Sequence, residues 1–171
     1  MSHKRLKILD LDDRSNQPLY CKQRRYLIIY NGKVYNYREL AKEYNIQLRT
    51  SSDTELVLEL YILLGSSFLK LLNGMFSFII FDTLTGKYFV ARDRLGIKPL
   101  YCFNNGLQII LYSEISPIVY LMNQYGNYDE VSLRQYKKLR TFFNDRTLCI
   151  FRRIRTVKPE FFGHETGNIR T

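Results

Sequence analysis

Two runs of β-forming residues joined by a short turn constrain the fold more than any other feature of the sequence. Residues 75–82 and 87–92 are rich in aromatic and β-branched side chains, and the four residues between them end in Gly86. Such runs, separated by a few turn residues that include glycine, predict an antiparallel hairpin. Residues 101–103 and 107–112, separated by Asn-Asn-Gly, predict a second hairpin. The chain is therefore expected to build antiparallel sheet.

A third β-forming run and four helices complete the predicted elements. Tyr26-Leu-Ile-Ile-Tyr30 predicts a strand that ends at Asn31-Gly32, a dipeptide typical of tight turns. Apolar residues at helical spacing predict a helix that Asp53 caps at its N-terminus and Gly65 ends. Further helices are expected at residues 37–44, from Ser113 to residue 121 and from Ser132 to residue 139. Strands that arrive as hairpins with helices between them indicate an α+β fold.

The size and composition indicate one soluble domain. The chain has 171 residues, of which 46% are hydrophobic, and this is enough to bury one core. We therefore expect a single domain over residues 1–171, with residues 150–171 at its edge. The N-terminus is charged from the start, and no apolar run is long enough for a signal peptide or a membrane span. These features favour a cytoplasmic protein that does not bind membranes.

Cysteine and charge patterns argue against several classes of function. Cys21, Cys102 and Cys149 are far apart and form no C-x-x-C pair or Cys/His cluster, so no disulfide framework, metal site or cofactor is predicted. The net charge is +10, and residues 133–171 carry ten Lys or Arg against three acidic residues. No nucleic-acid-binding motif accompanies this charge, so a solvated basic face is favoured over nucleic-acid recognition.

Six blocks of sequence carry information beyond the fold class. The longest is Ala91-Arg-Asp-Arg-Leu-Gly-Ile-Lys-Pro-Leu-Tyr101. The others are His3-Lys-Arg-Leu-Lys-Ile-Leu-Asp-Leu11 with Gln17-Pro18, Asn31-Gly-Lys-Val-Tyr-Asn-Tyr-Arg-Glu-Leu40, Ser52-Asp-Thr-Glu55, Leu72-Asn-Gly-Met-Phe-Ser-Phe78 and Ser113-Glu-Ile115. In this order and at this spacing they resemble the glutaminase domain of asparagine synthetases. Residues 142–148 are similar to the closing segment of the same domain.

This resemblance implies a class II glutamine amidotransferase fold of the N-terminal nucleophile hydrolase type, a sandwich of antiparallel sheets between helical layers. In the family, a cysteine at the mature N-terminus attacks the side-chain carboxamide of glutamine, and its own α-amine manages the proton. Ammonia leaves for asparagine synthesis, and water then releases glutamate from the thioester. The tetrahedral intermediate needs preorganised donors for its oxyanion.

The resemblance also implies roles for individual residues. Asn31, through its side-chain amide, and Gly32, through its backbone N–H, correspond to the oxyanion hole. Arg5 corresponds to the arginine that binds the α-carboxylate of glutamine, and Asp53 to the carboxylate that receives the α-ammonium. The backbone around three further residues would line the same site: Leu6, Ile8 and Leu9.

Simpler interpretations exist for several of these residues. Without its context, Asn31-Gly32 favours a hairpin turn, Asp53 a helix cap and Arg5 an exposed charge. The matching blocks around them favour the roles in the site instead. Residues 92–94 fit a structural segment better than a catalytic charge cluster. Ser2 would become an N-terminal nucleophile after removal of the initiator, but its position beside the arginine block favours a coincidence.

Three departures from the family pattern bear on activity. The opening Met-Cys-Gly segment and the first strands of the family are missing, and none of the three cysteines can replace an N-terminal nucleophile without cleavage. Lys33 stands where the family usually has glutamate, and a cation there would repel the α-ammonium of the substrate. No Ser-Gly-Gly-x-Asp-Ser pyrophosphatase loop is present, so the ATP-dependent synthetase half is absent from this chain. We therefore predict no glutaminase activity for the chain as given.

Two functional hypotheses follow from these observations. The first is an incomplete glutaminase domain of asparagine-synthetase type, which would serve a separate synthetase domain or subunit. The second is a non-catalytic glutamine-binding or protein-interaction subunit. Under both hypotheses, uncovered strand edges and the apolar run at residues 75–81 predict self-association.

Overall fold

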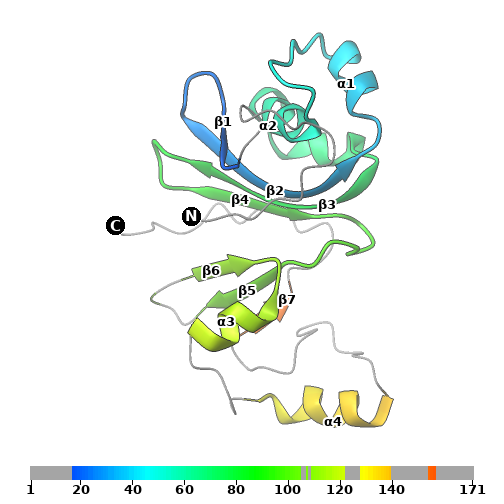
Figure 1. Ribbon diagram of the computed structural model, residues 1–171, viewed down its shortest axis with the longest axis vertical. Coiled ribbons are helices and arrows are strands. Elements are labelled where there is room, and N and C mark those ends of the chain that lie inside the picture. Colours follow the sequence, from blue (N-terminus) through cyan, green and yellow to red (C-terminus); the bar gives the residue numbers. More distant parts are fainter. Residues whose placement is uncertain (1–16, 105–106, 108, 122–127, 140–153, 157–171) are drawn as a thin grey trace. The chain divides into compact units, whose positions relative to one another are not determined.

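The computed structural model describes residues 17–104, 107, 109–121, 128–139 and 154–156 (Figure 1). The chain divides into two compact units with a boundary after Lys98. Both units combine antiparallel strands with helices, which confirms the predicted α+β class. Within the described ranges, no helix has the length and apolar character needed to cross a bilayer.

A four-stranded antiparallel sheet forms the first unit. Its strands follow the order β1 (Leu19–Tyr20), β2 (Tyr26–Val34), β3 (Gly74–Asp82) and β4 (Tyr88–Arg92). β2 and β3 pair along their whole length, whereas β1 pairs only with Leu27 and Ile28 of β2. β3 and β4 form the hairpin predicted for residues 75–92.

The strand predicted at residues 26–30 is longer than expected. β2 continues through Asn31 and Gly32 to Val34, so the turn predicted at this dipeptide is wrong. Gly32 lies opposite Phe76, and a Cβ atom at Gly32 would be 2.4 Å from the Met75 oxygen and 2.6 Å from the Phe76 Cα. The glycine therefore permits the close approach of two strands, which no side chain would allow.

Helix α2 (Asp53–Leu64) covers one face of this sheet (Figure 1). Four of its apolar residues are fully buried: Leu56, Val57, Leu58 and Leu60. Ser52 is the N-cap, because its side chain accepts the Thr54 N–H at 3.2 Å, so the prediction that Asp53 caps the helix is off by one residue. Gly65 ends α2 at φ 60°, as predicted.

Two shorter helical elements complete the first unit. α1 (Tyr37–Glu43) confirms the helix predicted at residues 37–44, and it contacts α2. The 3-10 helix η2 (Gly65–Leu71) follows α2 and buries Phe68. Phe68 packs beside Phe78 of β3 and Phe89 of β4, with ring centroids 6.0 and 6.4 Å away. These aromatic contacts fix η2 on the core of the sheet.

The second unit holds a three-stranded antiparallel sheet in the order β6 (Ile109–Tyr112), β5 (Tyr101–Asn104), β7 (Ile154–Thr156). β5 and β6 confirm the second predicted hairpin, whereas no element was predicted at β7. α3 (Ile115–Leu121) lies where a helix was predicted.

The second helix of this unit begins earlier than predicted. α4 (Glu130–Leu139) starts two residues before Ser132, because the Asp129 carboxylate accepts the Ser132 N–H at 2.8 Å and caps the helix.

Candidate functional site

The predicted site residues that the structure describes lie along the outer edge of β2, which faces away from β3. Two backbone groups mark this edge. The Tyr30 N–H donates to Oε1 of Gln17 at 2.6 Å, and Nε2 of Gln17 donates to the Tyr30 carbonyl at 2.9 Å. The Val34 N–H donates to Oδ2 of Asp53 at 2.8 Å. The outward-facing backbone groups of residues 30 and 34 are therefore hydrogen-bonded to side chains from outside the sheet.

Gly32 lies between these two positions, and its N–H points the same way. In an antiparallel strand, alternate residues direct their N–H groups to the same side. The pairing register supports this direction for the Gly32 N–H, because its partner residue Phe76 directs its own backbone groups away from β2. Its N–H donates to Oδ2 of Asp93 at 3.3 Å, and its carbonyl accepts the Asp93 N–H at 2.8 Å. Among the described residues, no acceptor for the Gly32 N–H is seen.

Asn31 places a second donor next to this N–H. Its side chain is half-buried, and it makes no hydrogen bond to any residue that the structure describes. The backbone of Asn31 is held in register opposite Ser77 of β3. Two adjacent donors on a paired strand, without partners in the described part of the chain, have the character of an oxyanion hole.

Asp53 closes the other end of the edge. Its side chain is buried, and Oδ2 accepts hydrogen bonds from the Val34 N–H at 2.8 Å and from the Tyr30 hydroxyl at 2.9 Å. Burial, followed by the charge of Asp53, raises the pKa of Tyr30 far above its usual value, so the hydroxyl keeps its proton and donates. No described residue donates to Oδ1, which leaves this oxygen able to accept from a cation.

The spacing of these groups sets the size of the molecule they suit. Gly32 and Val34 are two residues apart on an extended strand, a rise of about 7 Å. The free donor at Gly32 and the carboxylate held at Val34 are therefore separated by roughly the length of a small amino acid. A molecule with a carboxamide at one end, to accept from the Gly32 N–H, and an ammonium at the other, to pair with the Asp53 carboxylate, would match this edge.

Lys33 follows Gly32 on the same strand but makes its contact elsewhere. Its Nζ lies 5.7 Å from the centroid of the Tyr37 ring at the start of α1, within range of a cation–π interaction. This contact holds the ammonium on the α1 side of the strand end.

Arg92 and Asp93 hold a loop, which agrees with their predicted structural role. The Asp93 carboxylate accepts the N–H groups of Ile97 at 2.9 Å and Lys98 at 3.0 Å. Arg92 donates to the carbonyls of Lys98 at 2.6 Å and Gly96 at 2.5 Å. Both charged side chains therefore satisfy the backbone of residues 96–98.

Part of the predicted site lies outside the described residues. This applies to the residues expected around the α-carboxylate of the substrate: Arg5, Leu6, Ile8 and Leu9. In the described part of the chain, no three His, Cys, Asp or Glu side chains are grouped to hold a metal ion.

Sequence reasoning missed three contributors to the edge: Gln17, Tyr30 and the Val34 amide. A strand predicted to run on to Val34 would have revealed Tyr30 and Val34, because residues 30, 32 and 34 then share one side, whereas no sequence signal points to the Gln17 contact.

Comparison with known proteins places the chain in a family. The family model named glutamine amidotransferase domain matches residues 1–168. The glutamine-hydrolyzing asparagine synthetase B of Escherichia coli is 38% identical over 122 residues, which cover 70% of this chain and 22% of that protein. The glutamine-hydrolyzing asparagine synthetase 3 of Bacillus subtilis is 39% identical over 122 residues, with 68% and 20% covered. The chain spans about a fifth of the length of these two relatives.

Solved structures agree on the fold. The glutamine phosphoribosylpyrophosphate amidotransferase from B. subtilis, complexed with ADP and GMP, aligns with a TM-score of 0.50 at 25% identity over 59% of this chain and 25% of its own. A structure described as the allosteric regulatory enzyme of purine biosynthesis aligns with a TM-score of 0.53 at 24% identity over 63% and 25%. These similarities confirm the predicted N-terminal nucleophile hydrolase type of fold. The chain therefore belongs to the glutamine amidotransferase domain family, in the form found in asparagine synthetases.

Proposed function

We propose that this domain binds free glutamine along the outer edge of β2 and contributes the oxyanion-stabilising part of a glutaminase site. The observation that carries the proposal is the Gly32 N–H, a donor without a described partner between two outward groups that are already bonded. The carboxamide of glutamine would lie at Asn31 and Gly32. Its α-ammonium would bind Oδ1 of Asp53, and its α-carboxylate would bind Arg5, next to the backbone of Leu6, Ile8 and Leu9.

The donors at Asn31 and Gly32 act when the carboxamide is attacked. A thiolate adds to the carbonyl carbon, the carbonyl oxygen becomes negative, and the nitrogen then leaves as ammonia once it is protonated. Strand pairing holds the Gly32 N–H in place before the reaction, so little reorganisation is needed as the charge develops. Loss of one such donor typically lowers the rate by about 10²–10³.

The two described cysteines do not fit the nucleophile of this reaction. Cys21 is buried, and its Sγ accepts the Tyr26 N–H at 3.2 Å. Cys102 lies inside strand β5, where it is paired with Leu111 on one side and Arg155 on the other. In this proposal the ammonia would supply a synthetase domain or subunit, as the names of the relatives suggest.

Calorimetric titration with glutamine tests the proposal. We expect Asp53→Asn to weaken binding by about tenfold or more, because a charge-assisted hydrogen bond is lost. We expect Lys33→Glu to strengthen binding, because it restores the residue type usual in the family and removes a cation that would repel the α-ammonium. Asn31→Ala tests the proposed oxyanion donor, and Asn73→Ala, at an exposed asparagine between η2 and β3, is its matched control.

The outcomes separate the two functional hypotheses. No binding by the wild-type chain, or equal affinity for the Asp53 variant, would overturn the proposed site. Binding accompanied by glutamate release that depends on Asn31 would indicate a working glutaminase. Binding without release would favour the glutamine-binding subunit.

A further inference from the structure

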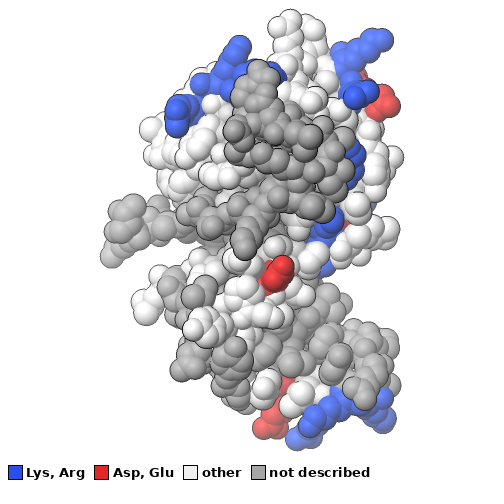
Figure 2. All heavy atoms as spheres, in the orientation of Figure 1, with Lys and Arg blue, Asp and Glu red and all other residues white. Residues whose placement is uncertain are grey.

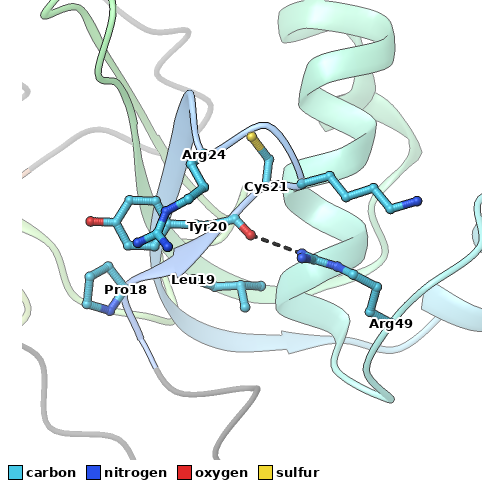
Figure 3. A pocket seen from close by; sticks show the side chains of 7 residues that line it. Pro18, Leu19, Tyr20, Cys21, Arg24 and Arg49 are labelled. Carbon is cyan, nitrogen blue, oxygen red and sulfur yellow. Dashed lines mark hydrogen bonds between the residues drawn. The ribbon is translucent and has the colours of Figure 1, made fainter.

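A second pocket lies where β1 is connected to β2, at the opposite end of β2 from Gly32. It has a volume of about 370 Å³ and is lined by Pro18, Leu19, Tyr20, Cys21, Lys22, Arg24 and Arg49 (Figure 3). Tyr20 pairs with Leu27, which is five residues from Gly32, or about 17 Å along the strand. The pocket is therefore separate from the glutamine site.

The side chains that line this pocket are basic or uncharged, and one of the basic ones, Arg49, is paired with Glu55. Three of its seven lining residues are Lys or Arg, and none is acidic. Figure 2 shows Lys and Arg atoms at the upper left, over the β1–β2 connection, with no acidic atoms beside them. A concave site of one sign concentrates ions of the opposite sign.

Arg24 lines one side of the pocket, and its side chain is exposed (Figure 3). Its N–H donates to the Cys21 carbonyl at 2.9 Å, and its backbone has φ 57°, a conformation that favours Gly or Asn over residues with long side chains. Its guanidinium lies 5.0 Å from the centroid of the Tyr20 ring. The side chain therefore occupies a defined place, although a smaller residue would suit the turn better.

Arg49 is fixed on the other side (Figure 3). Its Nε donates to Oε1 of Glu55 at 2.6 Å, and Nη2 donates to the Tyr20 carbonyl at 3.0 Å. The second oxygen of Glu55 accepts from the N–H and hydroxyl of Thr50 at 2.7 and 2.8 Å. A guanidinium has five N–H donors, so Arg49 keeps donors beyond those it gives to Glu55 and Tyr20.

From these contacts we propose that the pocket binds the phosphate group of a small molecule. A carboxylate is satisfied by a single guanidinium, whereas a phosphate offers oxygens in several directions and can accept from guanidinium groups on both sides. Lys22 is exposed and supplies a third cation. The volume lies in the range of small-molecule sites, and the hydrogen bonds that hold Arg49 reduce the entropy lost on binding.

Titration of the 171-residue chain with pyrophosphate and with inorganic phosphate, at constant ionic strength, tests the proposal. Amide NMR shifts at residues 19–24 would report binding at the pocket. We expect Arg24→Asn to weaken pyrophosphate binding by about tenfold, because charge-assisted hydrogen bonds are lost. Asparagine tolerates the left-handed backbone, so this variant is expected to fold as well as the wild type.

Arg38→Gln is the matched control. The Arg38 guanidinium also lies over a tyrosine ring, 5.6 Å from the centroid of Tyr37, but outside the pocket. We expect this variant to bind pyrophosphate like the wild type, and Lys22→Gln to bind it more weakly. If neither phosphate shifts the pocket resonances, or if Arg38→Gln loses as much affinity as Arg24→Asn, the surface is only diffusely basic and the proposal fails.

Discussion

Replacement of Gly32 by alanine would probe the close approach of β2 and β3 on which the candidate site is built. The added Cβ would lie 2.4 Å from the Met75 oxygen and 2.6 Å from the Phe76 Cα, and both are backbone atoms that cannot rotate away. Overpacking of this kind costs about 3 kcal/mol. The lower entropy of the unfolded chain returns about 0.5–1 kcal/mol. We therefore expect a net loss of about 2 kcal/mol in the free energy of unfolding.

Urea and thermal unfolding would measure this loss, with Gly86→Ala as the control. Gly86 has φ 71°, and nothing lies within 4 Å of a Cβ added there. That variant loses stability only through the strain of alanine in a left-handed conformation, about 1–2 kcal/mol, and the same entropic gain offsets part of this loss. For a chain of this size, 2 kcal/mol lowers Tm by about 4–8 °C. If Gly32→Ala loses no more stability than Gly86→Ala, the close approach of the strands is not what selects glycine.

Three further predictions follow from other contacts. Tyr30→Phe removes one of the two hydrogen-bond donors to Asp53. Calorimetry is expected to show about fivefold to tenfold weaker binding of glutamine, but unchanged binding of glutaramate, which lacks the α-amino group. Equal losses for both ligands would mean that Tyr30 has a purely structural role. The Arg25 guanidinium, 2.8 Å from Asp82, holds the pKa of that carboxyl below its usual value. A lowered pKa in the folded state gives stability above about pH 4 that is lost on acidification, so stability curves from pH 7 to 3 should fall less steeply for Arg25→Gln than for the wild type. Gel filtration at several concentrations should show self-association. Among the described strands, only β1 pairs with the outer edge of β2, and it does so at two residues, so much of this edge can pair with another chain. A monomer with a cooperative melt would contradict this prediction.

The local elements were predictable because short-range chemistry specifies them. The hairpin of β3 and β4 follows from two β-forming runs and a turn that contains Gly86. The end of α2 at Gly65 follows from the left-handed conformation that glycine adopts easily. The cap of α2 was misplaced by one residue, because Ser52 and Asp53 are both good caps and only the hydrogen bond to Thr54 distinguishes them.

The residues of the candidate site were chosen by family resemblance, and their geometry could not be predicted from the sequence. Asn31, Gly32 and Asp53 were singled out through family resemblance. Their arrangement along one strand edge depends on contacts between residues that are far apart in the sequence. Tyr30, whose hydroxyl holds Asp53, carries no motif of its own.

Periodicity, turn residues and matched blocks are local properties, so the α+β class, most strands and helices and the family could be predicted from the sequence. The position of Asn31-Gly32 inside a strand depends instead on tertiary contacts. The dipeptide prefers a turn, but nine consecutive pairs between β2 and β3 outweigh that preference, and Phe76 then leaves no room for any residue except glycine at position 32. The same pairing turns the N–H groups of residues 30, 32 and 34 away from β3. Gln17 accepts the Tyr30 N–H and Asp53 accepts the Val34 N–H, whereas the Gly32 N–H has no acceptor within the described part of the chain.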